Sequence, residues 1–177
     1  MRYELILWFM WVLKQVPGHI GCALRRKLLP CRIGTGTMIW DNVQIDFPGR
    51  LRLGERCSIN RGSVLNCGGG VEIKDDVLIG PNVIIYSQNH AYEDSTQLIS
   101  VQGYVRNKVT IEEDVWIAAN TMILPGVTVA RGCVVGAASV VTKSTEPNGV
   151  YVGSPARRIG RRHAQVRLRE EHEGNLL

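Results

Sequence analysis

Phenylalanine is scarce in this sequence, with two residues among 177, and all aromatic residues together make up 6% of the chain. Glycine, by contrast, reaches 19 residues. A chain poor in Phe and rich in Gly, Val and Ile does not favour a helical bundle; it is typical of many short strands with frequent corners. Hydrophobic residues make up 45% and charged residues 21%, which excludes a disordered chain. The length suffices for one domain with a real core.

A large charge of one sign is also absent. The formal net charge is +5, which favours anionic partners such as phosphates but is too small to indicate nucleic acid, so we expect no nucleic-acid partner. The five cysteines are odd in number and scattered, with no C-x-x-C pair and no His at ligand spacing. Neither a disulfide framework nor a zinc site is therefore expected, and we interpret the cysteines as buried free thiols in a reducing compartment.

The first 30 residues carry an apolar run of nine, 5–13. A bilayer-spanning helix needs roughly 17 to 25 such residues, and the features of a signal peptide are missing. Pro17 and Gly18 end the run, and the next segment holds the cluster Arg25, Arg26 and Lys27. Residues 1–30 are therefore expected to form two short helices. Two roles stay open for residues 3–29: a peripheral contact with the inner membrane face, or packing on their own domain or a sister subunit.

A repeat of six residues dominates the rest of the chain. Aliphatic residues recur at this spacing, and four residues after each comes a small or β-branched one; the aliphatic positions are Ile111, Ile117, Ile123, Val129, Val135 and Val141. The same hexad recurs earlier in other phases, which indicates short insertions at corners. A period of six fits neither a helix nor an alternating strand. It predicts an all-β solenoid, residues 31–155, in which three short sides close a coil of about 18 residues and the aliphatic residue points inward.

In such a solenoid all backbone pairing is expected to be parallel and between coils. Gly80, Gly136 and Asp114 are expected to suit the corner dihedrals. The repeat is interrupted once, at the polar segment 86–108, and long loops leaving a rigid scaffold are usually functional. Residues 156–177 read as a basic tail with helical composition from Ala164 to Glu173.

The motifs of this repeat resemble one known family, the hexapeptide-repeat acyltransferases, and most of all its galactoside, maltose and capsule or exopolysaccharide O-acetyltransferases. The matching segments are Asn89-His90, Val115–Ala119, Pro125–Val127, Val135–Lys143 and Gly153–Arg157. The resemblance implies a left-handed parallel β-helix, a homotrimer with active sites between neighbouring subunits, and acetyl-CoA as co-substrate without a metal. The left hand rests on the resemblance alone.

A histidine is the natural base for moving an acetyl group from a thioester to a hydroxyl, because its pKa lies near neutrality. His90 is the one histidine of the solenoid region, and the resemblance places the family's catalytic His here, twelve residues after Leu78. Either Glu93 or Asp94 is close enough in sequence to orient its ring, and a backbone carbonyl would serve equally well.

The resemblance also implies binding residues. Asn66 lies where related sugar acetyltransferases place an Asn that contacts the acceptor hydroxyl, and Asn89 adjoins the base. Ala119, Ala137 and Thr142 match positions that lie along the pantetheine arm of acetyl-CoA. The match assigns its phosphates to Arg157, with Arg158 and Arg161 beside it. The family's second basic residue falls on Gly160 here.

The sequence therefore predicts an acetyl-CoA-dependent O-acetyltransferase acting in the cytoplasm on a sugar hydroxyl, of a surface polysaccharide or its precursor. An N-acetyltransferase acting on an amino sugar nucleotide stays open. A serine O-acetyltransferase is less well matched, because those proteins usually carry a long helical N-terminal domain. An inactive scaffold would be expected to lose the His. A γ-type carbonic anhydrase is rejected, because its zinc needs three His and the repeat region has only His90.

Overall fold

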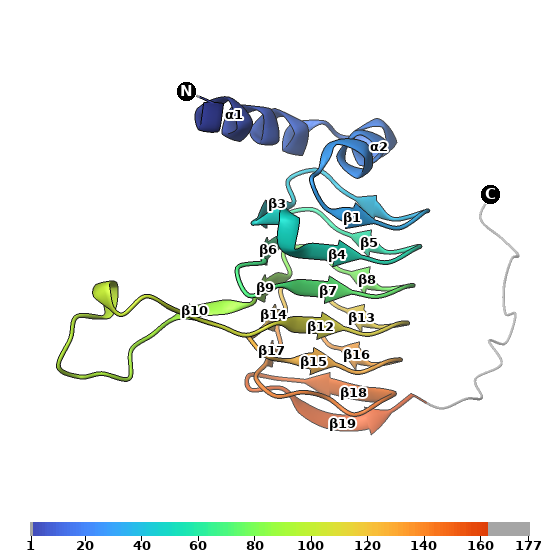
Figure 1. Cartoon of the computed structure of the whole chain (residues 1–177). Coiled ribbons are helices and arrows are strands. Elements are labelled where there is room, and N and C mark those ends of the chain that lie inside the picture. Colours follow the sequence, from blue (N-terminus) through green and yellow to red (C-terminus); the bar gives the residue numbers. More distant parts are fainter. Residues whose placement is uncertain (1, 163–177) are drawn as a thin grey trace, which may run out of the picture.

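A stack of β-coils, closed at one end by two helices, makes up the molecule (Figure 1). The computed structural model describes residues 2–162. Helices α1 (Arg2–Gln15) and α2 (Gly18–Leu28) come first, and three sheets follow, built mainly of parallel strands that successive coils contribute in turn. Within the described residues, no helix is both long and apolar enough to cross a membrane.

The three sheets form the sides of a prism. The first holds β1 (Arg32–Ile33), β4 (Leu51–Leu53), β7 (Val71–Ile73), β12 (Val109–Ile111) and β15 (Thr128–Val129). The second holds β2 (Met38–Ile39), β5 (Ser58–Ile59), β8 (Leu78–Ile79), β13 (Trp116–Ile117), β16 (Val134–Val135), β18 (Gly149–Val152) and β19 (Arg157–Arg161). The third holds β3 (Gln44–Asp46), β6 (Val64–Asn66), β9 (Ile84–Tyr86), β14 (Met122–Ile123) and β17 (Val140–Val141). A hairpin of β10 (Gln88–His90) and β11 (Tyr104–Arg106) stands apart, and two short 3₁₀ helices are η1 (Pro48–Arg50) and η2 (Ile99–Val101).

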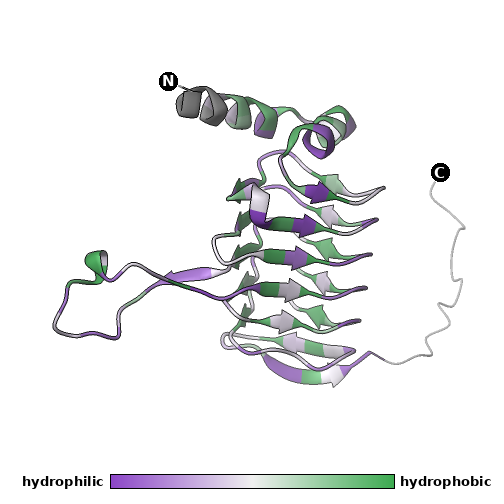
Figure 2. Ribbon diagram, viewed as in Figure 1, coloured by the Kyte–Doolittle hydropathy of each residue, from purple (hydrophilic) through white to green (hydrophobic). Residues whose placement is uncertain are grey.

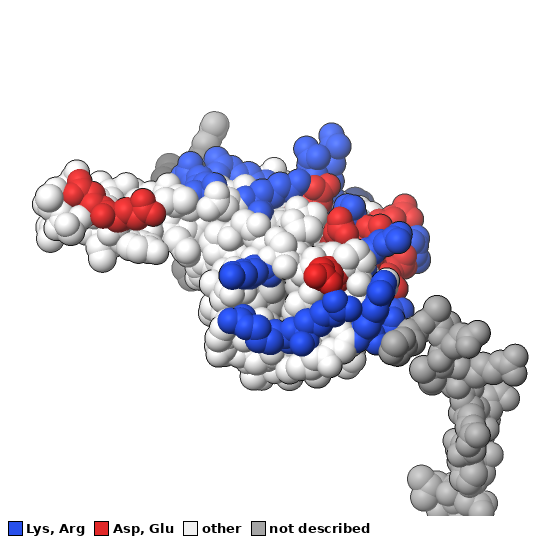
Figure 3. Space-filling view, turned by 90° about the horizontal axis from the view of Figure 1, so that it is seen from below, with Lys and Arg blue, Asp and Glu red and all other residues white. Residues whose placement is uncertain are grey.

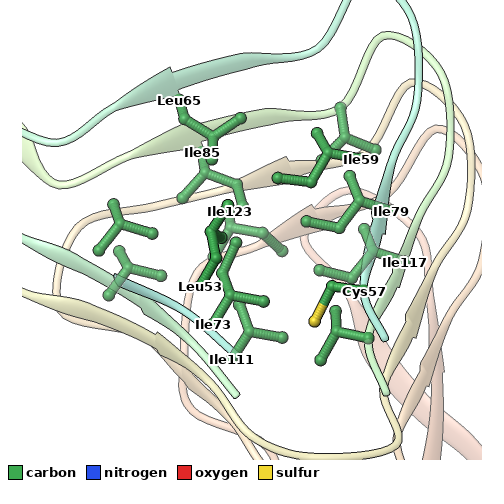
Figure 4. Close-up of a cluster of buried hydrophobic side chains, with 14 of the residues drawn as sticks. Leu53, Cys57, Ile59, Leu65, Ile73, Ile79, Ile85, Ile111, Ile117 and Ile123 are labelled. Atoms are coloured by element: carbon green, nitrogen blue, oxygen red, sulfur yellow. The ribbon is translucent and has the colours of Figure 1, made fainter. Parts of the chain in front are cut away.

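The hexad residues fill the interior, as predicted. Figure 4 shows them as columns, and the strand registers align Leu65, Ile85 and Ile123; Ile59, Ile79 and Ile117; and Leu53, Ile73 and Ile111. All nine are at most 5% exposed. Figure 2 shows the same hydrophobic bands repeating from coil to coil. These aliphatic columns supply most of the hydrophobic stabilisation of the fold, because each side chain is buried against those of the coil before it and the coil after it.

The small residues four positions later are also buried, where they satisfy the corners. The Thr121 hydroxyl donates to the carbonyl of Gly136 at 3.1 Å, and the Ser139 hydroxyl oxygen accepts from the amide of Gly153 at 3.0 Å. Corner backbone groups that cannot pair between strands thus find a side-chain partner inside the prism.

Gly80 and Gly136 were expected to be needed for their backbone dihedral angles, and this reason was wrong. Asp114 does adopt the left-handed conformation, with φ 58°, but Gly80 and Gly136 do not have positive φ; Asn82 (φ 56°) and Asn120 (φ 59°) do. Asn tolerates this conformation because its short side chain bonds locally. A Cβ at Gly80 would lie 2.8 Å from the backbone nitrogen of Ala119. Gly80 is therefore required by the close approach of two coils.

The expectation that all strand pairing is parallel was wrong at two places. β10 pairs antiparallel with β11, and β18 pairs antiparallel with β19. In the second case the chain folds back over the last coil and covers the sheet edge that a further coil would have paired. Residues 157–161, expected to begin the tail, thus form a strand of the sheet. The predicted helix from Ala164 to Glu173 lies outside the described residues.

The two expected N-terminal helices are present and cover the first coil. Arg25 of α2 is 2% exposed, and its guanidinium donates to the carbonyls of Ile39 at 2.7 Å, Leu13 at 2.9 Å and Val16 at 2.8 Å. One side chain thus joins the end of α1 to strand β2. A buried cation is tolerated there because several carbonyl oxygens surround it.

Candidate active site

The excursion loop begins as a hairpin, which positions His90. After β9 the chain leaves the third sheet, and β10 and β11 pair in the register Asn89 with Val105 and His90 with Tyr104. Figure 1 shows the hairpin and its loop projecting away from the coils. Asn89 and His90 are both exposed. Within the described part of the chain the predicted base therefore faces solvent.

The aromatic ring of Tyr104 packs against the imidazole of His90. The ring centroids lie 4.5 Å apart with an interplanar angle of 37°. Cross-strand aromatic pairs of this kind hold each other's side-chain torsions and add a modest stabilisation. Tyr104 is thus the aromatic side chain packed against the ring of His90 in the described structure. The sequence reasoning missed it, because the pairing becomes visible only once the hairpin register is known.

The two carboxylates considered for orienting His90 do not bond to it. Asp94 instead accepts hydrogen bonds from the Thr96 hydroxyl at 2.6 Å, the Thr96 amide at 2.9 Å and the Gln97 side chain at 2.6 Å. These bonds, the Thr96 hydroxyl first, hold the pKa of Asp94 below its usual value. Glu93 is exposed, and within residues 2–162 no hydrogen bond joins it to His90. Asp94 therefore bonds within the loop, and the side chain packed against His90 is Tyr104.

The two asparagines expected near the acceptor lie in different surroundings. Asn66, at the end of β6, is 8% exposed, and its side-chain oxygen accepts the amide of Gly68 at 3.1 Å. Its backbone carbonyl accepts the Ser87 hydroxyl at 2.7 Å. Asn66 therefore bonds to the residues at the root of the hairpin, whereas Asn89 is exposed on the hairpin itself.

A second residue that sequence reasoning missed lies at this root. Gln88 is 9% exposed, and within the described chain its buried Oε1 has no hydrogen-bond partner. Its amide lies directly on Gly68, where an added Cβ would come within 2.0 Å of Oε1. An unpaired buried acceptor next to the base is costly, so Gln88 is a point where a bound group could supply the missing donor.

The residues matched to acetyl-CoA lie along the solenoid and not on the hairpin. Ala119 and Ala137 occupy the same corner one coil apart, since the amide of Ala138 donates to the carbonyl of Ala119 at 2.9 Å. Thr142 follows β17 and is exposed. Ala119 is partly exposed and Ala137 exposed, so the small side chains at this corner leave room for a long arm to lie against two successive coils.

The basic cluster lies on β19, at the end of the solenoid opposite the helices. Figure 3 shows basic side chains gathered across this end. Arg158 forms an ion pair with Glu146 at 2.5 Å, whereas within residues 2–162 neither Arg157 nor Arg161 forms one. All three are exposed. Arg157 and Arg161 thus keep their charge available for an anionic ligand such as a phosphate.

The cysteines take no part in this chemistry. All five are free, as predicted, and four of them are buried. Burial raises the pKa of Cys31 to about 11 and that of Cys67 to about 12, so both thiols stay protonated near neutral pH and are poor nucleophiles. Among residues 2–162, no three His, Cys, Asp or Glu side chains come close enough to hold a metal ion.

Comparison with known proteins gives one consistent family. Residues 108–143 match the family model described as bacterial transferase hexapeptide (six repeats). The chain is 34% identical over 137 residues to a probable acetyltransferase of Mycobacterium tuberculosis, covering 77% of this chain and 46% of that one. The alignments span about half the length of the first curated relatives.

Two solved structures extend the likeness to the fold. One is a hexapeptide-repeat-containing acetyltransferase of Vibrio cholerae O1 biovar eltor complexed with acetyl-CoA, with TM-score 0.76, 30% identity, and coverage of 84% of this chain and 80% of that one. The other is a maltose O-acetyltransferase of Clostridium difficile 630, with TM-score 0.70, 31% identity, and coverage of 78% and 73%. The family match and this likeness confirm the predicted left-handed parallel β-helix.

Proposed function

The chain belongs to the family of hexapeptide-repeat acetyltransferases, and on this premise we propose that it transfers the acetyl group of acetyl-CoA to a sugar hydroxyl, with His90 as general base. The observation that carries the proposal is the placement of His90, which is exposed on a hairpin and held by the ring of Tyr104. The Vibrio cholerae relative with acetyl-CoA bound supports the donor.

In the proposed reaction the chain transfers a proton and positions the two substrates. His90 takes the proton of the acceptor hydroxyl as its oxygen attacks the thioester carbon. The tetrahedral intermediate collapses, the carbon–sulfur bond breaks, and the protonated imidazole returns the proton to the leaving sulfur. Tyr104 is proposed to hold the ring through both transfers, and Asn89, beside His90, is proposed to bind the acceptor. Arg157, Arg158 and Arg161 are assigned to the phosphates, with Arg157 and Arg161 the stronger contributors because Arg158 is already paired with Glu146.

The site is proposed to be completed in a homotrimer. His90 stands on a projecting hairpin, while Ala119, Ala137 and Thr142 lie on the solenoid, so one chain does not close a site around them. The outer surfaces of the sheets support the same assembly. The second sheet exposes Leu78 (52%) beside Trp116 (51%), apolar side chains that a neighbouring subunit would cover.

The acceptor is proposed to be a hydroxyl of a surface polysaccharide or its precursor. The maltose O-acetyltransferase relative supports a sugar as substrate class. The proposed reaction takes place in the cytoplasm, where acetyl-CoA is available, with residues 3–29 at the inner membrane face.

The direct test is release of the CoA thiol from acetyl-CoA against a panel of acceptors. The panel contains simple galactosides and maltose, a lipid-linked sugar, an amino sugar nucleotide and serine, and product mass and base-stability distinguish an ester from an amide. We expect acetyl esters on sugars. Turnover with the amino sugar nucleotide or serine alone would overturn the acceptor class, and no acceptor-dependent release from any of them would overturn the reaction. His19→Ala is a matched control, because His19 lies on α2 away from the hairpin.

A further inference from the structure

The N-terminal helices have two faces that differ in burial. One face is buried against the first coil: Leu13 is 4% exposed, Cys22 5% and Leu29 8%. These residues, with Arg25, seal the end of the prism in the way that terminal elements of repeat proteins do. Packing on their own domain, one of the two roles that the sequence left open for these helices, therefore needs only their buried face.

The opposite face is apolar but remains uncovered. On α1, Trp8 is 65% exposed, Trp11 53% and Val12 53%; on α2, Ile20 is 75% exposed and Leu24 37%. Residues three and four apart lie on the same side of a helix, so each set forms one stripe. The rings of Trp8 and Trp11 also contact each other, with centroids 6.0 Å apart in a T-shaped arrangement. Trp11 also borders a recess between α1 and the first coil, beside Val43, but half of its side chain and most of the Trp8 side chain stay uncovered by the described chain.

From residue 5 onward, the charged side chains of α1 and α2 all have one sign, and the carboxylate of Asp46 lies beyond them, at the recess that Trp11 borders. Residues 5–29 contain no Asp or Glu. Arg26 and Lys27 are exposed on α2, whereas the buried guanidinium of Arg25 donates its hydrogen bonds to backbone carbonyls. Tryptophan at an apolar surface beside Lys and Arg is the composition of a helix that lies in a membrane interface with anionic lipid.

We propose that the outward faces of α1 and α2 form a docking surface for an anionic lipid bilayer, with Trp8, Trp11 and Ile20 inserting and Arg26 and Lys27 meeting head groups. Capping and membrane contact are then two faces of the same helices and not alternatives. Figure 1 shows α1 and α2 lying across the end of the coil stack, so the coils would stand away from the bilayer, with the hairpin beside them. This arrangement deepens the proposed function, on which it rests in one respect: it would present His90 to an acceptor carried on a lipid.

Deleting the segment would not test this surface, because the cap would be lost as well. Surface substitutions separate the two roles. The triple variant Trp8→Gln, Trp11→Gln, Ile20→Gln keeps Leu13, Cys22, Arg25 and Leu29 and is expected to fold. Ile159→Gln is the matched control, because Ile159 is 67% exposed on β19 at the other end of the solenoid.

Co-sedimentation with vesicles of phosphatidylglycerol and phosphatidylcholine gives the readout. We expect the wild type and Ile159→Gln to bind these vesicles and not pure phosphatidylcholine, and the triple variant to lose at least tenfold in partition. The variant Arg26→Gln, Lys27→Gln should lose about 30-fold, since each basic residue near an anionic surface contributes about 1 kcal/mol.

Acetyl transfer to a water-soluble acceptor serves as the second measurement. It should be unchanged in the triple variant, so failure of the surface and failure of the proposed reaction are distinguishable. The proposal is overturned if the wild type ignores anionic vesicles or if the triple variant binds them like the wild type. It is also overturned if the triple variant halves the mass of the assembly in solution, which would mean that this face joins two copies.

Discussion

The imidazole of His90 and the phenol ring of Tyr104 face each other across the two strands of a hairpin, with ring centroids 4.5 Å apart. This contact answers a question that the sequence left open, namely what holds the predicted base. The carboxylate of Asp94 is bonded to Thr96 and Gln97 instead, so among the described residues the group packed against the imidazole is an aromatic ring and not a carboxylate.

If Tyr104 positions His90, its ring matters and its hydroxyl does not. We expect Tyr104→Phe to keep kcat within about threefold and Tyr104→Leu to lower it by about tenfold, since loss of a packed aromatic partner removes roughly 0.5 to 1.5 kcal/mol. KM for acetyl-CoA should stay the same in both, because the ring does not touch the assigned carrier residues. Steady-state kinetics with acetyl-CoA varied measures this split. Equal losses in the Phe and Leu variants would refute the positioning role.

If the second sheet lies at the subunit interface of a homotrimer, a charge added to that sheet should dissociate the assembly, and a charge added to the first sheet should not. Trp116→Glu places a carboxylate on the apolar outer surface of the second sheet and should dissociate the assembly, because a buried unpaired charge is strongly unfavourable. Arg52→Glu, on the first sheet, is the matched control and should leave the mass unchanged. Light scattering at micromolar concentration measures both. A single-subunit mass for the active wild type would rule the trimer out.

The assignment of the carrier phosphates predicts unequal effects among three arginines. Arg157→Ala should raise KM for acetyl-CoA by about tenfold with little change in kcat, because a charge-assisted hydrogen bond contributes roughly 1.5 to 3 kcal/mol. Arg158→Ala should have the smaller effect, since Arg158 already pairs with Glu146. Initial rates over a range of acetyl-CoA and salt concentrations provide the comparison. An unchanged KM in Arg157→Ala would remove Arg157 from the site.

The coils were predictable from the sequence because every coil obeys the same local rule. A residue such as Ile117 has the same surroundings as Ile79 before it and Val135 after it, so the hexad spacing alone gives the register. The family was predictable for the same reason, since its motifs lie within the repeat. The corner role of Gly80 was misjudged, because spacing between coils cannot be inferred from a dihedral preference.

The interruption of the repeat at residues 86–108 was expected, but the pairing and packing inside it were not predictable. The partner of His90 depends on how β10 and β11 pair, and the segment between them has no periodicity to fix the register. The burial of Asn66 and Gln88 depends on how the hairpin root packs on Gly68. Strand β19 was read as tail, because its basic composition gives no sign that it pairs with β18.

Turnover of His90→Ala tests the central claim most directly. With the acceptor that gives the wild type its highest rate, thiol release should fall at least about a hundredfold, the usual scale for loss of a general base, while His19→Ala stays within twofold of the wild type. The thermal midpoint of His90→Ala should be unchanged, because His90 is exposed and outside the core. A folded His90→Ala protein with near-normal turnover would contradict the account.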